Sequence, residues 1–237
     1  MQNQWNNEDA RNLIGDPLSA RVYATSLIAK TETLANGLSG IGSVKTEAQN
    51  PFGETEAQLA IIENDHTDEN PSISDLRAFK QESLLKIIAA ASLSADDSAT
   101  QLQLAATSPL DQPAPLEALL HGAIPARFVD QTCAAPILAL VRQANCAQLA
   151  EEIYGQRVLV IPAASSLSEQ ARSIANLIQS SDLESIEGII VEGIGLFAFH
   201  DEAEQSYKRS LQLTEQAQSF FEAQSNSSDS TSSGESA

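Results

Sequence analysis

The segment FVDQTC, residues 128–133, carries polar side chains that can take part in chemistry. Side chains at i and i+2 of an extended strand project to the same side, so Gln131 and Cys133 are expected to share one pocket at a strand end. A reactive Cys133 needs a cation or a histidine to lower its pKa, and no such neighbour stands nearby in sequence. A zinc site would need His66 or His200 beside these two residues, and glutamine is a weak ligand. A small buried thiol is the simpler interpretation.

Three other features have chemical and structural interpretations. Lys45 is the residue type that forms Schiff bases, but the sequence gives no sign that it is desolvated. His121 follows Leu119 and Leu120 on an amphipathic segment, which favours a packed histidine over a metal ligand. The glycine pair at 193 and 195 lacks the third glycine of a dinucleotide-binding turn.

Helices and strands alternate along the chain, which predicts an α/β fold. Helical spacing of apolar residues predicts helices over 8–31, 75–93, 96–106, 116–124, 134–143, 145–154, 168–180 and 201–223. Compact apolar runs predict strands over 57–63, 127–132, 157–162, 187–192 and 196–200. The glycine-rich stretch 35–46 is expected to be flexible. Asp201 is the expected N-cap of the last helix, with Glu204 completing a capping box.

The chain has 237 residues and a formal net charge of −19, from 13 basic and 32 acidic residues. Nucleic acids and anionic membranes require a basic surface, so neither is an expected partner. We find no apolar run long enough to span a membrane and no signal peptide. Two cysteines make no disulfide framework, which indicates the cytoplasm. One domain over 1–223 and a disordered, serine-rich acidic tail over 224–237 are expected.

Several phrases occur in the order found in a known family. They are residues 21–29, 43–46, 116–132, 152–162 and 187–210, the last reading EGIIVEGIGLFAFHDEAEQSYKRS. The sequence resembles the class II aldolase/adducin family, and within it the aldolase half of bifunctional rhamnulose-1-phosphate aldolase/alcohol dehydrogenase proteins. The resemblance implies a three-layer α/β/α domain around a mostly antiparallel sheet, commonly assembled as homo-oligomers.

The same resemblance locates the metal site of the family. Its members cleave a phosphorylated ketose with a zinc ion held by three histidines, two in an H-T-H phrase and one in N-H-G. The corresponding positions here are Gln131, Cys133 and Ile194. The resemblance therefore implies that all three ligands are replaced.

The substrate loops of the family are altered as well. The first phosphate loop corresponds to residues 38–43, where Gly40 and Ser43 remain and Ile41 replaces an asparagine. The second corresponds to residues 63–66, where the carboxylates of Glu63 and Asp65 are expected to repel a phosphate. Glu117 matches the glutamate that moves protons in the family, although Pro115 replaces the serine of its phrase.

The leading hypothesis is a catalytically degenerate class II aldolase-fold domain that acts by binding or assembly. No cofactor is expected, or zinc if the family activity survives. The expected partners are further copies of this chain, an active aldolase or dehydrogenase subunit, or a small sugar-like ligand. The alternatives are a metal-dependent carbon–carbon lyase acting on a sugar phosphate such as rhamnulose 1-phosphate, and a purely structural oligomer.

Overall fold

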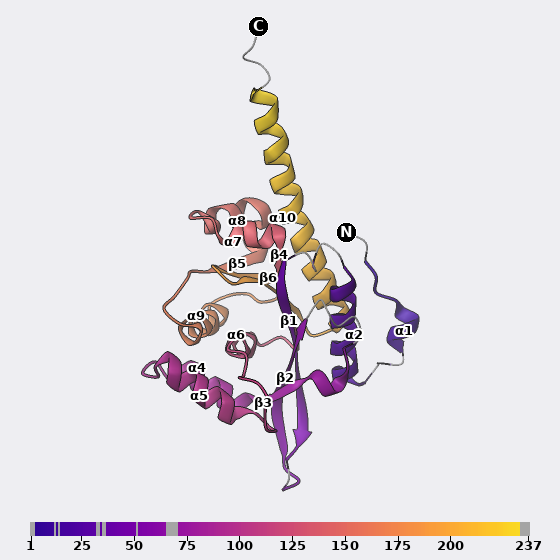
Figure 1. Cartoon of the computed structure of the whole chain (residues 1–237), viewed down its shortest axis with the longest axis vertical. Helices are drawn as coiled ribbons and strands as arrows, with labels where there is room; N and C mark the ends of the chain where they lie inside the picture. The colour runs from indigo at the N-terminus through magenta and orange to yellow at the C-terminus, as the bar shows by residue number, and fades with distance from the viewer. Residues whose placement is uncertain are drawn as a thin grey trace.

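Figure 1 shows the computed structural model, which describes residues 3–11, 13, 15–31, 34, 37–50, 52–64 and 71–232. The described residues form a seven-stranded sheet in the order β3-β2-β1-β4-β7-β6-β5. Its strands are β1 (Gly37–Gln49), β2 (Thr55–Asn64), β3 (Arg77–Lys80), β4 (Phe128–Ala134), β5 (Val158–Ile161), β6 (Gly188–Val191) and β7 (Gly195–His200). Neighbouring strands are antiparallel except β5 and β6, which are parallel. The sheet is therefore mixed and mostly antiparallel, as expected.

Strand β1 corrects the expectation of a flexible glycine-rich stretch. Its residues pair with β2 on one side and with β4 on the other, so the glycines lie within the sheet. A Cβ atom at Gly40 would collide with the carbonyl oxygen of Gln131, and one at Gly42 would lie 2.7 Å from Cζ of Arg21. These glycines allow other groups to approach the strand closely, rather than making it flexible.

The helices of the described residues pack in two groups. They are α1 (Asn7–Arg11), α2 (Pro17–Lys30), α4 (Gln81–Ala89), α5 (Ala95–Ala105), α6 (Ala118–Ala123), α7 (Ala135–Val141), α8 (Cys146–Tyr154), α9 (Leu167–Gln179) and α10 (Ala203–Ser232). One buried cluster joins the sheet to α4, α5, α6 and α9, and a second joins it to α2, α7, α8 and α10. Phe197 and Phe199 of β7 enter the first cluster, whereas Leu196 and Ala198 enter the second. This division follows from the alternation of side chains along a strand.

Two predicted helices are divided differently in the structure. The stretch 8–31 forms α1 and α2, because Pro17 begins α2 and the carboxylate of Asp16 accepts from the backbone N–H groups of Leu18 and Ser19. The predicted helix over 75–93 instead contains strand β3 followed by the shorter helix α4. The strand β3 pairs with residues 58–61 of β2, and this long-range partner overrides the local helical pattern.

The last helix differs from the expectation at both ends. Helix α10 begins at Ala203, and the carboxylate of Asp201 accepts from the backbone N–H of Arg127 at 2.9 Å instead of acting as the N-cap. The helix continues to Ser232 and projects from the body of the protein (Figure 1). Residues 224–232, expected to be disordered, are thus helical, and no glycine or proline interrupts 203–232. Residues 233–237 of the predicted tail lie outside the described residues. None of the helices in the described ranges is long and apolar enough to cross a membrane.

Candidate functional site

Strand β4 and the turn between β6 and β7 bring together Gln131, Cys133 and Ile194, the three positions that the resemblance matches to metal ligands of the family. Gln131 and Cys133 lie on β4 and are each 5% exposed. The Cys133 thiol donates to the backbone oxygen of Ile194 at 3.2 Å, and the Gln131 amide nitrogen lies 3.9 Å from the same sulfur. Gly195 allows this approach, because a Cβ atom there would lie 2.6 Å from the Thr132 oxygen. The structure therefore places the side chains of Gln131 and Cys133 in contact beside Ile194.

His121 of α6 joins this group. Its ring is fully buried, with Nδ1 2.8 Å from Oγ of Ser43 and Nε2 3.3 Å from Oε1 of Gln131. Its edge meets the ring of Phe197, with 5.3 Å between the ring centroids. Burial lowers the pKa of His121 to about 3, so the ring is neutral near pH 7. The sequence predicted a packed histidine but not its bond to Gln131.

The hydrogen bonds around His121 determine which ring nitrogen carries the proton. Oε1 of Gln131 can only accept, so Nε2 of His121 must donate to it. Nδ1 then accepts from the hydroxyl of Ser43. At the other end of the same side chain, the amide nitrogen of Gln131 donates toward the sulfur of Cys133. The thiol of Cys133 in turn donates to the backbone oxygen of Ile194. The contacts form a chain of donors and acceptors that runs in one direction, and we call it the Ser43–Ile194 relay.

The donor set at Gln131, Cys133 and Ile194 does not fit a zinc ion. Burial raises the pKa of Cys133, which favours the neutral thiol, whereas zinc binds the thiolate. Gln131 offers an amide oxygen already bonded to His121, and Ile194 offers an aliphatic side chain. Across the residues that the structure describes, no group of three or more histidine, cysteine, aspartate or glutamate side chains is placed to hold a metal.

The remaining matched positions are Glu117, Ile41 and Gly40, and they differ in how they relate to Gln131 and Cys133. Glu117 precedes α6 and is half-buried, and its negative charge adds to burial in raising the pKa of Cys133. Residues 117 and 121 are four apart, a spacing that puts both on one helical face and could have pointed to their common site. Ile41, which the resemblance matches to an asparagine of the family, is 7% exposed and belongs to the hydrophobic core. Gly40 lies against the backbone of Gln131.

Lys45 is more buried than the sequence indicated. Its ammonium group donates to the backbone oxygens of His121 at 3.2 Å and Ala126 at 2.9 Å. Burial lowers the pKa of Lys45 to about 8, opposed by the charge of Asp201. Both carbonyls belong to the segment from α6 to β4, so Lys45 anchors the elements that carry His121 and Gln131.

The sequence offers two other candidate ligands, His200 and His66. His200 accepts from the backbone N–H of Glu202 through Nδ1 at 2.9 Å, in the turn before α10. His66 lies outside the described residues.

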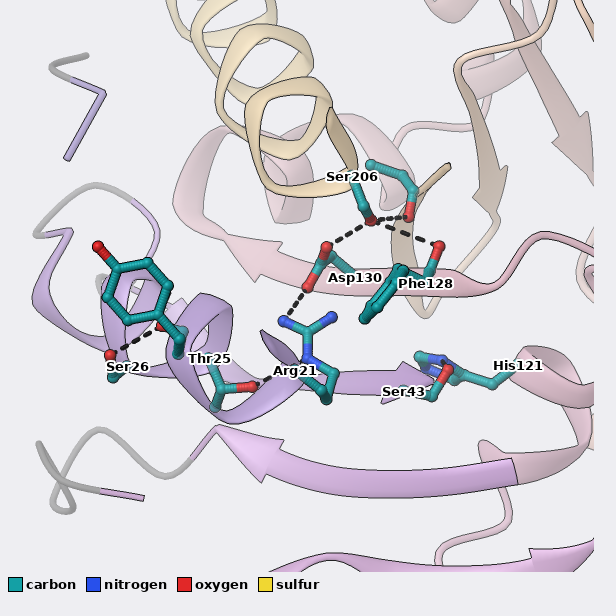
Figure 2. Close-up of polar contacts among 10 residues, drawn as sticks. Arg21, Thr25, Ser26, Ser43, His121, Phe128, Asp130 and Ser206 are labelled. Carbon is teal, nitrogen blue, oxygen red and sulfur yellow. Dashed lines mark hydrogen bonds and ion pairs between the residues drawn. The ribbon is translucent and has the colours of Figure 1, made fainter. Parts of the chain in front are cut away.

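A buried ion pair holds β4 at Asp130, the residue before Gln131. Figure 2 shows the guanidinium of Arg21, from α2, beside the carboxylate of Asp130, and the two groups lie 2.6 Å apart. Both side chains are at most 1% exposed. Arg21 also donates to Thr25 at 3.2 Å, and Asp130 accepts from Ser206 of α10 at 2.5 Å. These contacts connect α2, β4 and α10 directly beside Gln131.

Comparisons with known proteins agree on the fold. No family model matches the chain. The chain superposes with a TM-score of 0.78 on the N-terminal class II aldolase domain of a conserved protein from Thermoplasma acidophilum, at 21% identity, covering 93% of this chain and 99% of that one. The TM-score is 0.59 for an aldolase II superfamily protein from Pseudomonas syringae, at 16% identity, covering 90% and 78%. The L-fuculose-1-phosphate aldolase of Thermus thermophilus gives 0.52 at 17% identity, covering 87% and 94%.

One curated protein is similar in sequence. It is the uncharacterized oxidoreductase YuxG of Bacillus subtilis (strain 168), 22% identical over 218 residues, which are 92% of this chain and 31% of that protein. The chain thus spans about a third of this relative. Together with the superpositions, which include aldolases of this superfamily, the comparisons confirm the resemblance: the chain has the class II aldolase fold.

Proposed function

We propose that this chain is a class II aldolase-fold domain that does not carry out zinc-dependent aldol cleavage and that acts by assembly with other protein chains. The observation that carries the proposal is the Ser43–Ile194 relay. It uses the polar atoms of Gln131 and Cys133 for internal hydrogen bonds at the positions where the family has metal ligands.

The chemistry of the reaction supports this proposal. Aldol cleavage needs an electrophile that stabilises the enediolate formed as the carbon–carbon bond breaks. A carboxylate such as Glu117 can move a proton, but it cannot replace the electrophile. His121 stays neutral near pH 7 and is enclosed, so it offers no positive charge to a substrate oxygen.

Assembly is favoured over the binding of a small sugar-like ligand in the former pocket. Gln131, Cys133 and His121 are each at most 5% exposed, and Ile41 has joined the core. The proposed partners are further copies of this chain or an active aldolase or dehydrogenase subunit. The oxidoreductase name of the longer YuxG protein supports a dehydrogenase subunit as the partner.

Two further expectations also have support. The two packed clusters support the three-layer arrangement of the fold. The two free buried cysteines are consistent with a cytoplasmic location.

The first test measures metal and activity together. The purified chain is incubated with zinc, dialysed and analysed for bound metal, and the same sample is assayed for release of dihydroxyacetone phosphate from ketose 1-phosphates. We expect substoichiometric zinc and no release. One zinc per chain together with product release would overturn the proposal and support the carbon–carbon lyase.

The second test restores the family ligands with the variant Gln131→His/Cys133→His/Ile194→His. The backbone positions already converge, so we expect this triple variant to bind zinc, while Gln131→His alone, as a matched control, does not. Equal zinc binding by the two variants would contradict the proposed ligand positions. Light scattering of the unmodified chain, with and without a candidate aldolase or dehydrogenase subunit, then tests assembly. A lone 25.2 kDa particle in every mixture would contradict it.

A further inference from the structure

Strand β5 forms one edge of the sheet and leaves part of its backbone open. It pairs with β6 on one side only, where the backbone oxygen of Arg157 accepts from Glu187 at 2.8 Å. Backbone groups alternate in direction along a strand, so those of Val158 and Val160 point away from β6. On the side of β5 that has no neighbouring strand, each of these valines therefore offers one donor and one acceptor.

A groove of about 400 Å³ runs along this edge. Its floor is β5, where Leu159 and Val160 are half-buried, and its walls come from helix α8 and from the turn that follows α9. Ala147 and Ile186 add apolar surface to the two walls. The groove thus combines an open strand edge with apolar positions on both sides, which is the arrangement that accepts an extended peptide as an added strand.

The charge of the groove is negative. Glu151 on one wall and Asp182 on the other are the charged side chains, and no lysine, arginine or histidine lines the groove within the described residues. The nearby Arg157 is already engaged, with its guanidinium 2.6 Å from Glu187 and 2.9 Å from Gln216. The electrostatic complement of this surface is a cationic partner.

The same charges argue against a second copy of this chain at the edge. An edge-to-edge pair of β5 strands would bring Glu151 and Asp182 of one copy toward the same carboxylates of the other, and the whole chain carries a net charge of −19. Like charges across an interface disfavour association.

We propose that the β5 edge binds an extended, basic peptide segment of another protein by strand addition. Backbone hydrogen bonds to Val158 and Val160 hold the segment. Its alternate apolar side chains contact the groove, and its lysine or arginine side chains reach Glu151 and Asp182. This proposal is independent of the loss of zinc chemistry, because β5 contributes no residue to the Ser43–Ile194 relay.

The experiment uses fluorescence anisotropy with a labelled peptide of alternating lysine and valine and the full chain. Three probes are compared: the basic peptide, the same peptide with alternate backbone nitrogens methylated, and a peptide with glutamate in place of lysine. Methylation keeps the charge and removes the backbone donors. We expect saturable binding of the first probe that weakens with added salt, and no saturable binding of the other two.

Variants of the chain localise the binding. Glu151→Gln/Asp182→Asn is expected to weaken the basic peptide about fivefold to tenfold, the effect of two exposed ion pairs. Glu8→Gln/Asp9→Asn on α1 removes the same charge elsewhere and is expected to leave binding unchanged. Equal loss in both double variants, or equal binding of the methylated peptide, would reduce the effect to general charge attraction and overturn the proposal. Self-association abolished by Val160→Pro would also overturn it, by assigning the edge to a second copy.

Discussion

Replacing Asp130 with alanine is expected to leave the buried guanidinium of Arg21 without its counter-charge. The two groups lie 2.6 Å apart, and the side chains are 1% and 0% exposed. Nη1 of Arg21 has no hydrogen-bond partner within the described residues even in the unmodified chain. Because both groups are enclosed, water cannot replace the lost carboxylate without local opening of the fold.

The magnitude follows from this burial. Removing one member of a buried ion pair costs about 3–5 kcal/mol of the free energy of unfolding. The Ser206 hydroxyl also loses its shortest partner, the Asp130 carboxylate at 2.5 Å, although two backbone oxygens remain within 3.5 Å. We therefore expect Asp130→Ala to cost about 4 kcal/mol, a large part of the roughly 5–15 kcal/mol that stabilises a typical domain. The double variant Arg21→Met/Asp130→Leu removes both charges and should cost far less.

Urea unfolding followed by fluorescence measures these differences. The single tryptophan, Trp5, is half-buried and packs on Tyr23 with 5.0 Å between the ring centroids, so it reports tertiary structure near α2. Glu82→Ala, which removes an exposed ion pair with Lys86, is the control and should leave the free energy of unfolding almost unchanged. A cost below about 1 kcal/mol for Asp130→Ala would refute the reasoning. So would an Arg21→Met/Asp130→Leu variant whose loss of stability equals the sum of the losses from Arg21→Met and Asp130→Leu made separately.

Three further measurements, two of them on variants, test the surroundings of the site. Side-chain NMR of His121 should show the neutral ring, protonated at Nε2, from about pH 5 to 8. Because the folded pKa of His121 is about 3, its contribution to the free energy of unfolding falls as pH drops from about 6.5 toward 3. A ring that titrates near pH 6.5 would contradict the structure. Gly40→Ala should lower the urea midpoint, because the new Cβ meets the Gln131 oxygen, and an unchanged midpoint would argue against the β1–β4 register. The folded pKa of Lys45, about 8, lies below its unfolded value of 10.5, so its contribution to the free energy of unfolding should rise from pH 8 to 10.5. Urea unfolding at several pH values should show this rise in the unmodified chain and not in Lys45→Met. The same rise in both proteins would exclude Lys45 as its source.

The second half of the fold was predictable because its patterns are local. The strands β5, β6 and β7 are short apolar runs, and helical periodicity marks α8 before β5 and α9 between β5 and β6. The resemblance then supplied the family fold, which the superpositions confirm. Strand β1 was missed because its glycines indicate flexibility when considered alone. Its conformation depends on pairing with β2 and β4, the second of which lies about ninety residues further along the chain.

For the candidate site, the sequence by itself determined that Gln131 and Cys133 share a side of one strand, since side-chain alternation is a property of the extended backbone. The resemblance added Ile194 as the third position. Only the tertiary structure decided that His121 bonds Gln131, that Lys45 is desolvated and that Arg21 pairs with Asp130, 109 residues apart. Burial and long-range contacts set these properties, because the polarity around a side chain depends on which distant segments exclude water from it.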